Sequence, residues 1–132
     1  MIMRSNVLLI MLVSVVGLGA GTLRAPEHGC PGSHPALTNI TIVYNPAGIT
    51  VSPPTANAHK GGVLRFNLFG TFGKVVSVQG KAGTTPDPSW INASGSNLKF
   101  YVCVPSDQTA GYYSYKVEAQ DSPTLDPIVR IL

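Results

Sequence analysis

Two neighbouring stretches, Phe100–Pro105 (FYVCVP) and Gly111–Val117 (GYYSYKV), best define the fold of this 132-residue chain. In each stretch apolar side chains alternate with others, which is the pattern of a β-strand with one buried face. The predicted inward-facing residues are Leu98, Phe100, Val102 and Val104 in the first strand and Tyr113, Tyr115 and Val117 in the second. The same alternation places Cys103 on the outward face, outside the main core.

The rest of the chain after residue 35 consists of similar short segments. The chain contains eleven prolines and fourteen glycines, and this favours many short strands joined by tight turns. Trp90 and Ile91 lie in the long connection 80–97 and are expected to cover one end of the fold. The predicted strands are 36–44, 48–52, 63–68, 74–79, 98–104, 112–119 and 128–132. The predicted fold class is therefore all-β, a Greek-key β-sandwich of about seven strands over residues 36–132.

The first 25 residues have the composition of an export segment. Arg4 is the only early charge, Val7–Val16 is apolar, and a glycine-rich exit begins at Gly17. This order is typical of a cleaved secretory signal peptide. The uncharged run also approaches the length that spans a bilayer, so an uncleaved membrane anchor is the alternative, and only in that case is a membrane an expected partner. Residues 26–35 are predicted to form a flexible arm, and the expected location is secreted, periplasmic or on the cell surface.

The charge balance argues against a nucleic-acid partner. The whole chain has a net charge of +3. Arg4 and Arg24 belong to the export segment or its edge, and without them seven basic residues face six acidic ones, a net charge of +1. A nearly neutral domain has no electrostatic attraction for a phosphate backbone.

Four phrases of the chain together resemble small exported cupredoxin-like domains: Lys60–Asn67 (KGGVLRFN), Phe100–Pro105, Gly111–Val117 and Leu125–Ile131 (LDPIVRI). The resemblance implies a cupredoxin-like sandwich, an architecture close to the immunoglobulin-like one. Copper-binding members carry a ligand histidine soon after the strand that ends in asparagine, and another soon after the strand cysteine. Neither Leu68–Lys74 nor the residues after Cys103 up to Gln108 contain a histidine. The resemblance therefore implies the fold without the usual blue-copper ligands.

The two cysteines of the chain, Cys30 and Cys103, allow two interpretations. In an oxidising compartment two cysteines most often pair, and a Cys30–Cys103 disulfide would hold the arm across the outer face of the sandwich. Alternatively His28, Cys30, His34 and Cys103 form a metal site, with His59 as a further candidate, because imidazole and thiolate ligands suit copper or zinc. Cleavage after Ala25 would create another Cu(II) or Ni(II) site from the free amine and His28.

A catalytic set is not recognisable in the sequence. The carboxylates are isolated, several of them beside proline or serine in predicted turns, and the hydroxyls of 106–109 have no histidine near them in sequence. We therefore expect a non-enzymatic protein without a cofactor. Its expected role is an exported structural or interaction module that binds a protein partner or itself, for example as a subunit of a surface assembly. The alternative is a periplasmic or extracellular copper-binding protein that uses the His/Cys arm.

Overall fold

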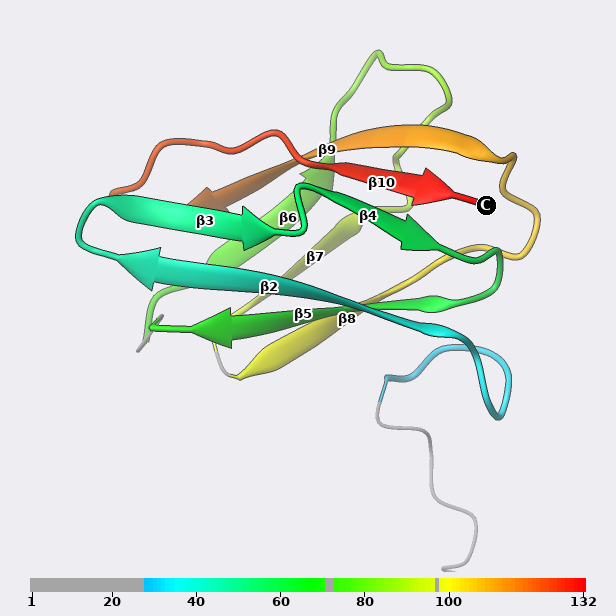
Figure 1. Cartoon of the computed structure of the whole chain (residues 1–132), viewed down its shortest axis with the longest axis horizontal. Helices are drawn as coiled ribbons and strands as arrows, with labels where there is room; N and C mark the ends of the chain where they lie inside the picture. The colour runs from blue at the N-terminus through cyan, green and yellow to red at the C-terminus, as the bar shows by residue number, and fades with distance from the viewer. Residues whose placement is uncertain (1–27, 71–72, 97) are drawn as a thin grey trace, which may run out of the picture.

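A computed structural model describes residues 28–70, 73–96 and 98–132 as two stacked β-sheets (Figure 1). The predicted export segment 1–25 and residues 26–27 of the arm lie outside the described residues. Nine strands are described: β2 (Leu37–Asn45), β3 (Gly48–Ser52), β4 (Thr55–Ala58), β5 (Val63–Phe69), β6 (Val76–Gly80), β7 (Asn92–Gly95), β8 (Lys99–Cys103), β9 (Gly111–Ala119) and β10 (Ile128–Ile131). None of the described residues forms a helix that could cross a bilayer.

The all-β sandwich predicted from the sequence is confirmed. One sheet has the strand order β4-β10-β9-β6-β7 and the other has the order β3-β2-β5-β8. Both sheets are mixed, because β2 pairs with β5 and β4 with β10 in parallel, whereas the other pairs are antiparallel. All seven predicted strands are present, and all but 48–52 have shifted ends.

Two described strands, β4 and β7, were not predicted. Their sequences, TANA and NASG, are only four residues long and contain a single β-branched residue between them. Local propensity therefore gives no strand signal there. Each becomes a strand through backbone pairing, β4 with β10 and β7 with β6, so these two elements depend on tertiary structure.

The core lies between the sheets and follows the predicted alternation. Ring contacts join the two layers: Phe66 stacks on Phe100 with ring centroids 5.2 Å apart, and Tyr115 meets Phe66 edge-on at 6.0 Å. Ile91 is fully buried, and half-buried Trp90 packs edge-on against Tyr113 at 5.5 Å. The long connection 80–91 therefore supplies core side chains, as expected from its two large apolar residues.

Corners where the chain passes from one sheet to the other protect the sheet edges. At one corner Pro53–Pro54 joins β3 to β4, and the Thr38 hydroxyl donates to the Asn57 carbonyl at 3.0 Å. At the other corner β7 runs into β8, and Gly95 lies so close to the Phe100 ring that a Cβ there would be 3.0 Å from it. The segment after β9 passes over β3 (Figure 1), where the Tyr44 hydroxyl donates to the Gln120 carbonyl at 3.3 Å. Such coverage limits edge-to-edge pairing with other chains.

One inward-facing prediction was wrong. Leu98 was expected to share the buried face of its strand with Phe100, but its side chain is 80 % exposed. Leu98 lies before β8 begins, in the connection from β7 at the end of the sandwich. Its carbonyl still accepts from the Leu68 amide at 2.8 Å, but its side chain lies outside the packed layers.

Candidate functional site

The arm and β8 are joined by the predicted disulfide. Cys30 and Cys103 form this bond with their Cα atoms 5.5 Å apart, and neither cysteine of the described chain is free. Cys103 lies on the outward face of β8, as the alternation predicted, and Cys30 is 5 % exposed. The disulfide prediction is therefore confirmed, and residues 28–35 are held at the end of the sheet where β5 begins, because Cys103 pairs with Val63.

The three histidines of the proposed metal site make separate contacts. His28 Nδ1 accepts a hydrogen bond from the Cys30 amide at 2.8 Å, and the His28 ring meets Tyr101 edge-on at 6.3 Å. His34 Nδ1 lies 3.2 Å from the Ser33 hydroxyl, and His59 is exposed in the turn before β5. Across the described ranges, no three His, Cys, Asp or Glu side chains come together to hold a metal ion. Because Cys30 and Cys103 are bonded to each other, neither has a thiolate that can bind a metal. The copper site proposed for the His/Cys arm stays a prediction.

A hollow lies beside the connection from β6 to β7. This cavity of about 290 Å³ is lined by polar residues that include Gln79, Lys81, Asp87 and Asn92 and by apolar ones that include Pro88 and Ile91. The Asp87 carboxylate accepts from the Ser89 amide at 3.1 Å and from the Ser89 hydroxyl at 2.9 Å. These bonds shape the turn, which is the role predicted for this aspartate.

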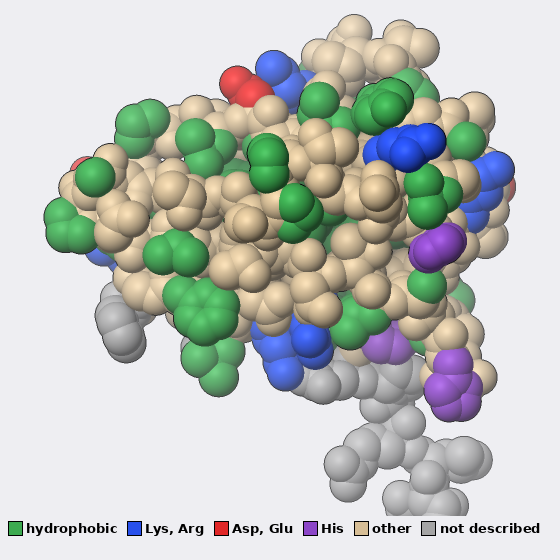
Figure 2. Space-filling view, viewed as in Figure 1, with side chains coloured by type: hydrophobic (Ala, Val, Ile, Leu, Met, Phe, Trp, Pro, Cys, Tyr) green, Lys and Arg blue, Asp and Glu red, His purple; other side chains and the backbone are tan. Residues whose placement is uncertain are grey.

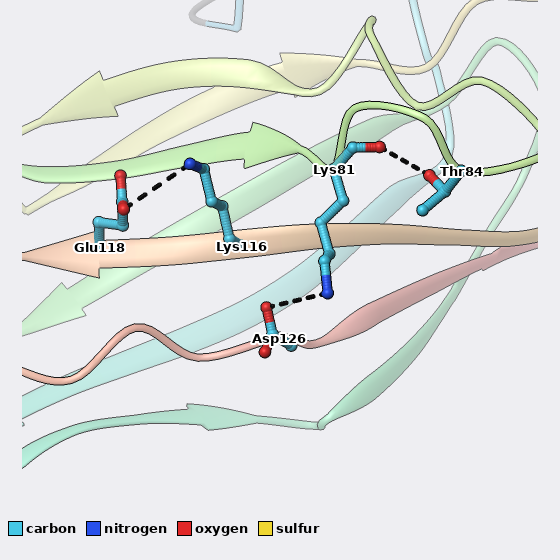
Figure 3. Close-up of polar contacts among 5 residues, drawn as sticks. All are labelled: Lys81, Thr84, Lys116, Glu118 and Asp126. Carbon is cyan, nitrogen blue, oxygen red and sulfur yellow. Dashed lines mark hydrogen bonds and ion pairs between the residues drawn. The ribbon is translucent and has the colours of Figure 1, made fainter.

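The cations beside this cavity are paired with carboxylates (Figure 3). Lys81 Nζ lies 3.4 Å from Asp126, and Lys116 Nζ lies 3.8 Å from Glu118. The two ammonium groups point away from one another in Figure 3, so they do not converge on a common ligand position. The Lys81 carbonyl accepts from the Thr84 hydroxyl at 2.7 Å, which holds the first turn of the connection. Lys81 and Lys116 therefore do not form a shared anion site beside this cavity.

Exposed apolar side chains gather at the opposite end of β5 from the disulfide. Phe69 is 56 % exposed, and its register partner on β2, Val43, is exposed as well. Leu98 lies at the same end, because its carbonyl pairs with the Leu68 amide. We call Val43, Phe69 and Leu98 the apolar end. Figure 2 shows hydrophobic side chains on the left of the view, over the ends of β2 and β5. Sequence reasoning missed this group, although extending the alternation of 63–68 by one residue already places Phe69 outward.

The middle of the outward face of the four-stranded sheet is polar, and it lies between two apolar rows, Leu37 with Val63 and Val43 with Phe69. Its side chains come from alternate positions of β2, β5 and β8, and Asn39, Arg65 and Tyr101 lie in one row across the three strands. The side-chain oxygen Oδ1 of Asn39 accepts from Arg65 Nε at 2.8 Å and from Asn67 Nδ2 at 3.2 Å.

The chain matches no protein-family model, and no curated protein matches it.

Proposed function

We propose that this protein is an exported, non-catalytic interaction module that binds another protein chain, either a partner or a second copy, through its apolar end. The observation that carries the proposal is the exposure of Val43, Phe69 and Leu98 at one end of the sandwich. The other exposed large apolar side chains among the described residues are Leu37, Val75, Tyr112 and Leu132. Grouped exposed apolar side chains mark protein interaction sites in soluble proteins, whereas single ones need no explanation.

The energetics favour this end over the sheet edges. Burying a large aliphatic or aromatic side chain contributes about 1.5–3 kcal/mol, so Phe69 and Leu98 together could supply much of the binding free energy of a modest complex. The β3 edge, by contrast, lies beside the segment after β9, which is held by the bond from the Tyr44 hydroxyl to the Gln120 carbonyl. Strand addition by a partner would have to displace those contacts.

The disulfide supports the proposed compartment. Disulfides persist in secreted, periplasmic and cell-surface proteins and are rare in reducing compartments. The Cys30–Cys103 bond joins residues that are 73 positions apart, so it links the arm to a distant strand of the domain. This bond is consistent with an exported module that presents the apolar end to other chains. A subunit of a surface assembly is one such module.

A double variant, Phe69→Ser with Leu98→Ser, tests the proposal. If the partner is a second copy, light scattering over a concentration series should show association of the wild-type chain. If the partner is a different protein, pull-down from the medium of the protein's own host should recover it. The double variant should lose that association, by about a hundredfold or more in Kd if both side chains are buried. The matched control is Tyr112→Ser, which removes an exposed aromatic ring from the outer face of β9 in the other sheet.

Two outcomes would contradict the proposal. One is equal association by the wild type and the double variant. The other is a wild-type chain that stays monomeric and captures no partner. A further variant, which lacks residues 26–35 and carries Cys103→Ser, tests whether the arm makes the contact instead. Association that is lost only in this variant would assign the contact to the arm.

A further inference from the structure

The outward face of the four-stranded sheet forms a regular array of hydrogen-bonding side chains. The parallel pairing of β2 with β5 places Asn39 opposite Arg65 and Thr41 opposite Asn67. The antiparallel pairing of β5 with β8 continues the first row to Tyr101. Neighbouring strands are about 4.8 Å apart and successive outward residues on one strand about 6.6–7 Å apart, so these five side chains form a regular grid over β2, β5 and β8. We call them the polar grid.

Hydrogen bonds hold the centre of the polar grid without a carboxylate. The Asn39 amide oxygen accepts from both Arg65 and Asn67, which aligns the guanidinium and the second amide beside it. A guanidinium has five N–H donors and an amide NH₂ has two, so most of the donors of this cluster are not used by its internal bonds. Tyr101 lies next to Arg65 in the row, and the His28 ring packs edge-on against it.

None of the five described Asp and Glu side chains belongs to a strand of this sheet. Asp87, Asp107, Glu118, Asp121 and Asp126 belong to the five-stranded sheet or to loops. Two of the lysines on that side, Lys81 and Lys116, are neutralised by ion pairs there. In Figure 2 the lower half of the view, below β2 and β5, shows blue and purple side chains without red ones. The protein is therefore nearly neutral as a whole but has one face with positive charge and no described carboxylate.

This combination fits an acidic carbohydrate better than other partners. A flat surface rich in N–H donors can bind the hydroxyls and carboxylates of an extended sugar chain, and an arginine fork matches a carboxylate. Tyrosine offers an apolar ring with a polar tip for contact with a sugar ring. The five side chains of the grid include no aliphatic residue for the apolar core of a protein interface, although Leu37 and Val43 flank them on β2. The strands β2, β5 and β8 carry two cations, Arg65 and Lys99, which are too few for the phosphate-dominated binding of DNA.

We propose that the polar grid binds an extended acidic polysaccharide, with Arg65 bound to its carboxylates and Tyr101 against a sugar ring. This site goes beyond the protein-binding role proposed for the apolar end and does not depend on it.

The test is affinity electrophoresis of the full mature chain in gels that contain polygalacturonate, with neutral dextran as the comparison polymer. The wild type should be retarded by polygalacturonate and not by dextran. Arg65→Gln should weaken binding about tenfold, as expected for the loss of a charge-assisted hydrogen bond. Tyr101→Ala should also weaken it, with circular dichroism confirming that both variants fold.

The other sheet offers a matched control. Arg130 and Tyr112 are register partners on its outward face, with the Arg130 guanidinium 5.9 Å from the Tyr112 ring centroid. Arg130→Gln removes the same charge beside the same kind of ring. It should leave the affinity for polygalacturonate within about twofold of the wild type, a change in binding free energy below about 1 kcal/mol.

Four outcomes would overturn the proposal. No retardation of the wild type would remove it outright, and equal retardation by dextran would remove the acidic specificity. Equal losses in Arg65→Gln and Arg130→Gln would indicate net charge rather than a site. Retardation by double-stranded DNA at the same concentration as polygalacturonate would assign the face to polyanions in general. The Phe69→Ser, Leu98→Ser variant should still bind, so failure of the protein-binding proposal and failure of this one give different results.

Discussion

At the scale of single residues, Tyr113 and Tyr115 show how the same side chain can have opposite effects on stability. Both lie on the inward face of β9 and are fully buried. The Tyr113 hydroxyl donates to the Thr109 carbonyl at 2.6 Å. The Tyr115 hydroxyl is buried and has no hydrogen-bond partner among the described residues. A satisfied buried hydroxyl contributes to stability, whereas an unsatisfied one costs free energy.

Replacing each tyrosine with phenylalanine should therefore change the free energy of unfolding in opposite directions. Tyr113→Phe should lower it by about 1 kcal/mol, because the Thr109 carbonyl loses its donor. Tyr115→Phe should leave it unchanged or raise it by about 1 kcal/mol, because the ring packing against Phe66 remains and the orphaned hydroxyl is gone. Urea denaturation followed by fluorescence measures both. A larger loss in Tyr115→Phe than in Tyr113→Phe would show that the Tyr115 hydroxyl has a partner.

The same two tyrosines predict an alkaline limit to stability. Burial raises the pKa of Tyr115 and of Tyr113 above their ordinary value, because it disfavours the charged phenolate. A raised folded-state pKa means that the native protein holds its protons more tightly than the unfolded chain. This contribution is fully present below the unfolded-state value of about pH 10 and is lost as the pH rises above it.

We therefore expect the free energy of unfolding to fall above about pH 10, and to fall less steeply in Tyr115→Phe. Thermal melts across the alkaline range, with tyrosinate absorbance followed in parallel, measure this. Ionisation of all five tyrosines before any loss of structure would contradict it.

At the scale of elements, the arm is attached to a sandwich that is already complete. Every described strand lies at or after Leu37, so none of them includes the arm. The arm is held by the disulfide and by the contact of His28 with Tyr101. The disulfide should therefore affect the stability of the domain more than its shape.

A Cys30→Ser, Cys103→Ser variant tests this. With 73 positions between the cysteines, the chain-entropy treatment gives about 4 kcal/mol of lost stability. The β-sheet circular dichroism should be unchanged at low temperature, while Tm falls. A thiol assay on the native wild type should detect no free cysteine. Two reactive thiols, or a variant without the β-sheet signal, would show that this account of the arm is wrong.

The disulfide also determines what copper should do. An intense blue absorption requires a cysteine thiolate bound to Cu(II) beside two imidazoles, and both sulfurs are bonded to each other. Addition of Cu(II) to the oxidised protein should therefore give at most a weak band from the histidines of the arm. A strong charge-transfer band that disappears in Cys103→Ser would support the copper-binding alternative instead.

At the scale of the whole molecule, the two proposed surfaces lie on one strand. Arg65 and Phe69 both point outward from β5 and are four residues apart, which is about 13 Å along a strand. Substitutions separated by more than about 7–10 Å usually act independently. The apolar end and the polar grid can therefore be changed one at a time.

A triple variant, Arg65→Gln with Phe69→Ser and Leu98→Ser, should show the sum of the separate losses. Polygalacturonate retardation should match that of Arg65→Gln alone, and light scattering should match the Phe69→Ser, Leu98→Ser variant. Loss of both activities from either parent variant would show that the two surfaces are one site or that the sandwich has been disturbed.

The sequence by itself determined the fold class, the seven predicted strands and the faces of most core residues, because a side-chain period of two is a local property. It also pointed to the disulfide, since two cysteines in an exported chain favour pairing. Tertiary structure alone decided β4 and β7, which exist through backbone pairing with β10 and β6. It also decided the exposure of Leu98 and the grouping of Asn39, Arg65 and Tyr101. Those outcomes depend on which strands become neighbours and where the layers end, and no local pattern carries that information.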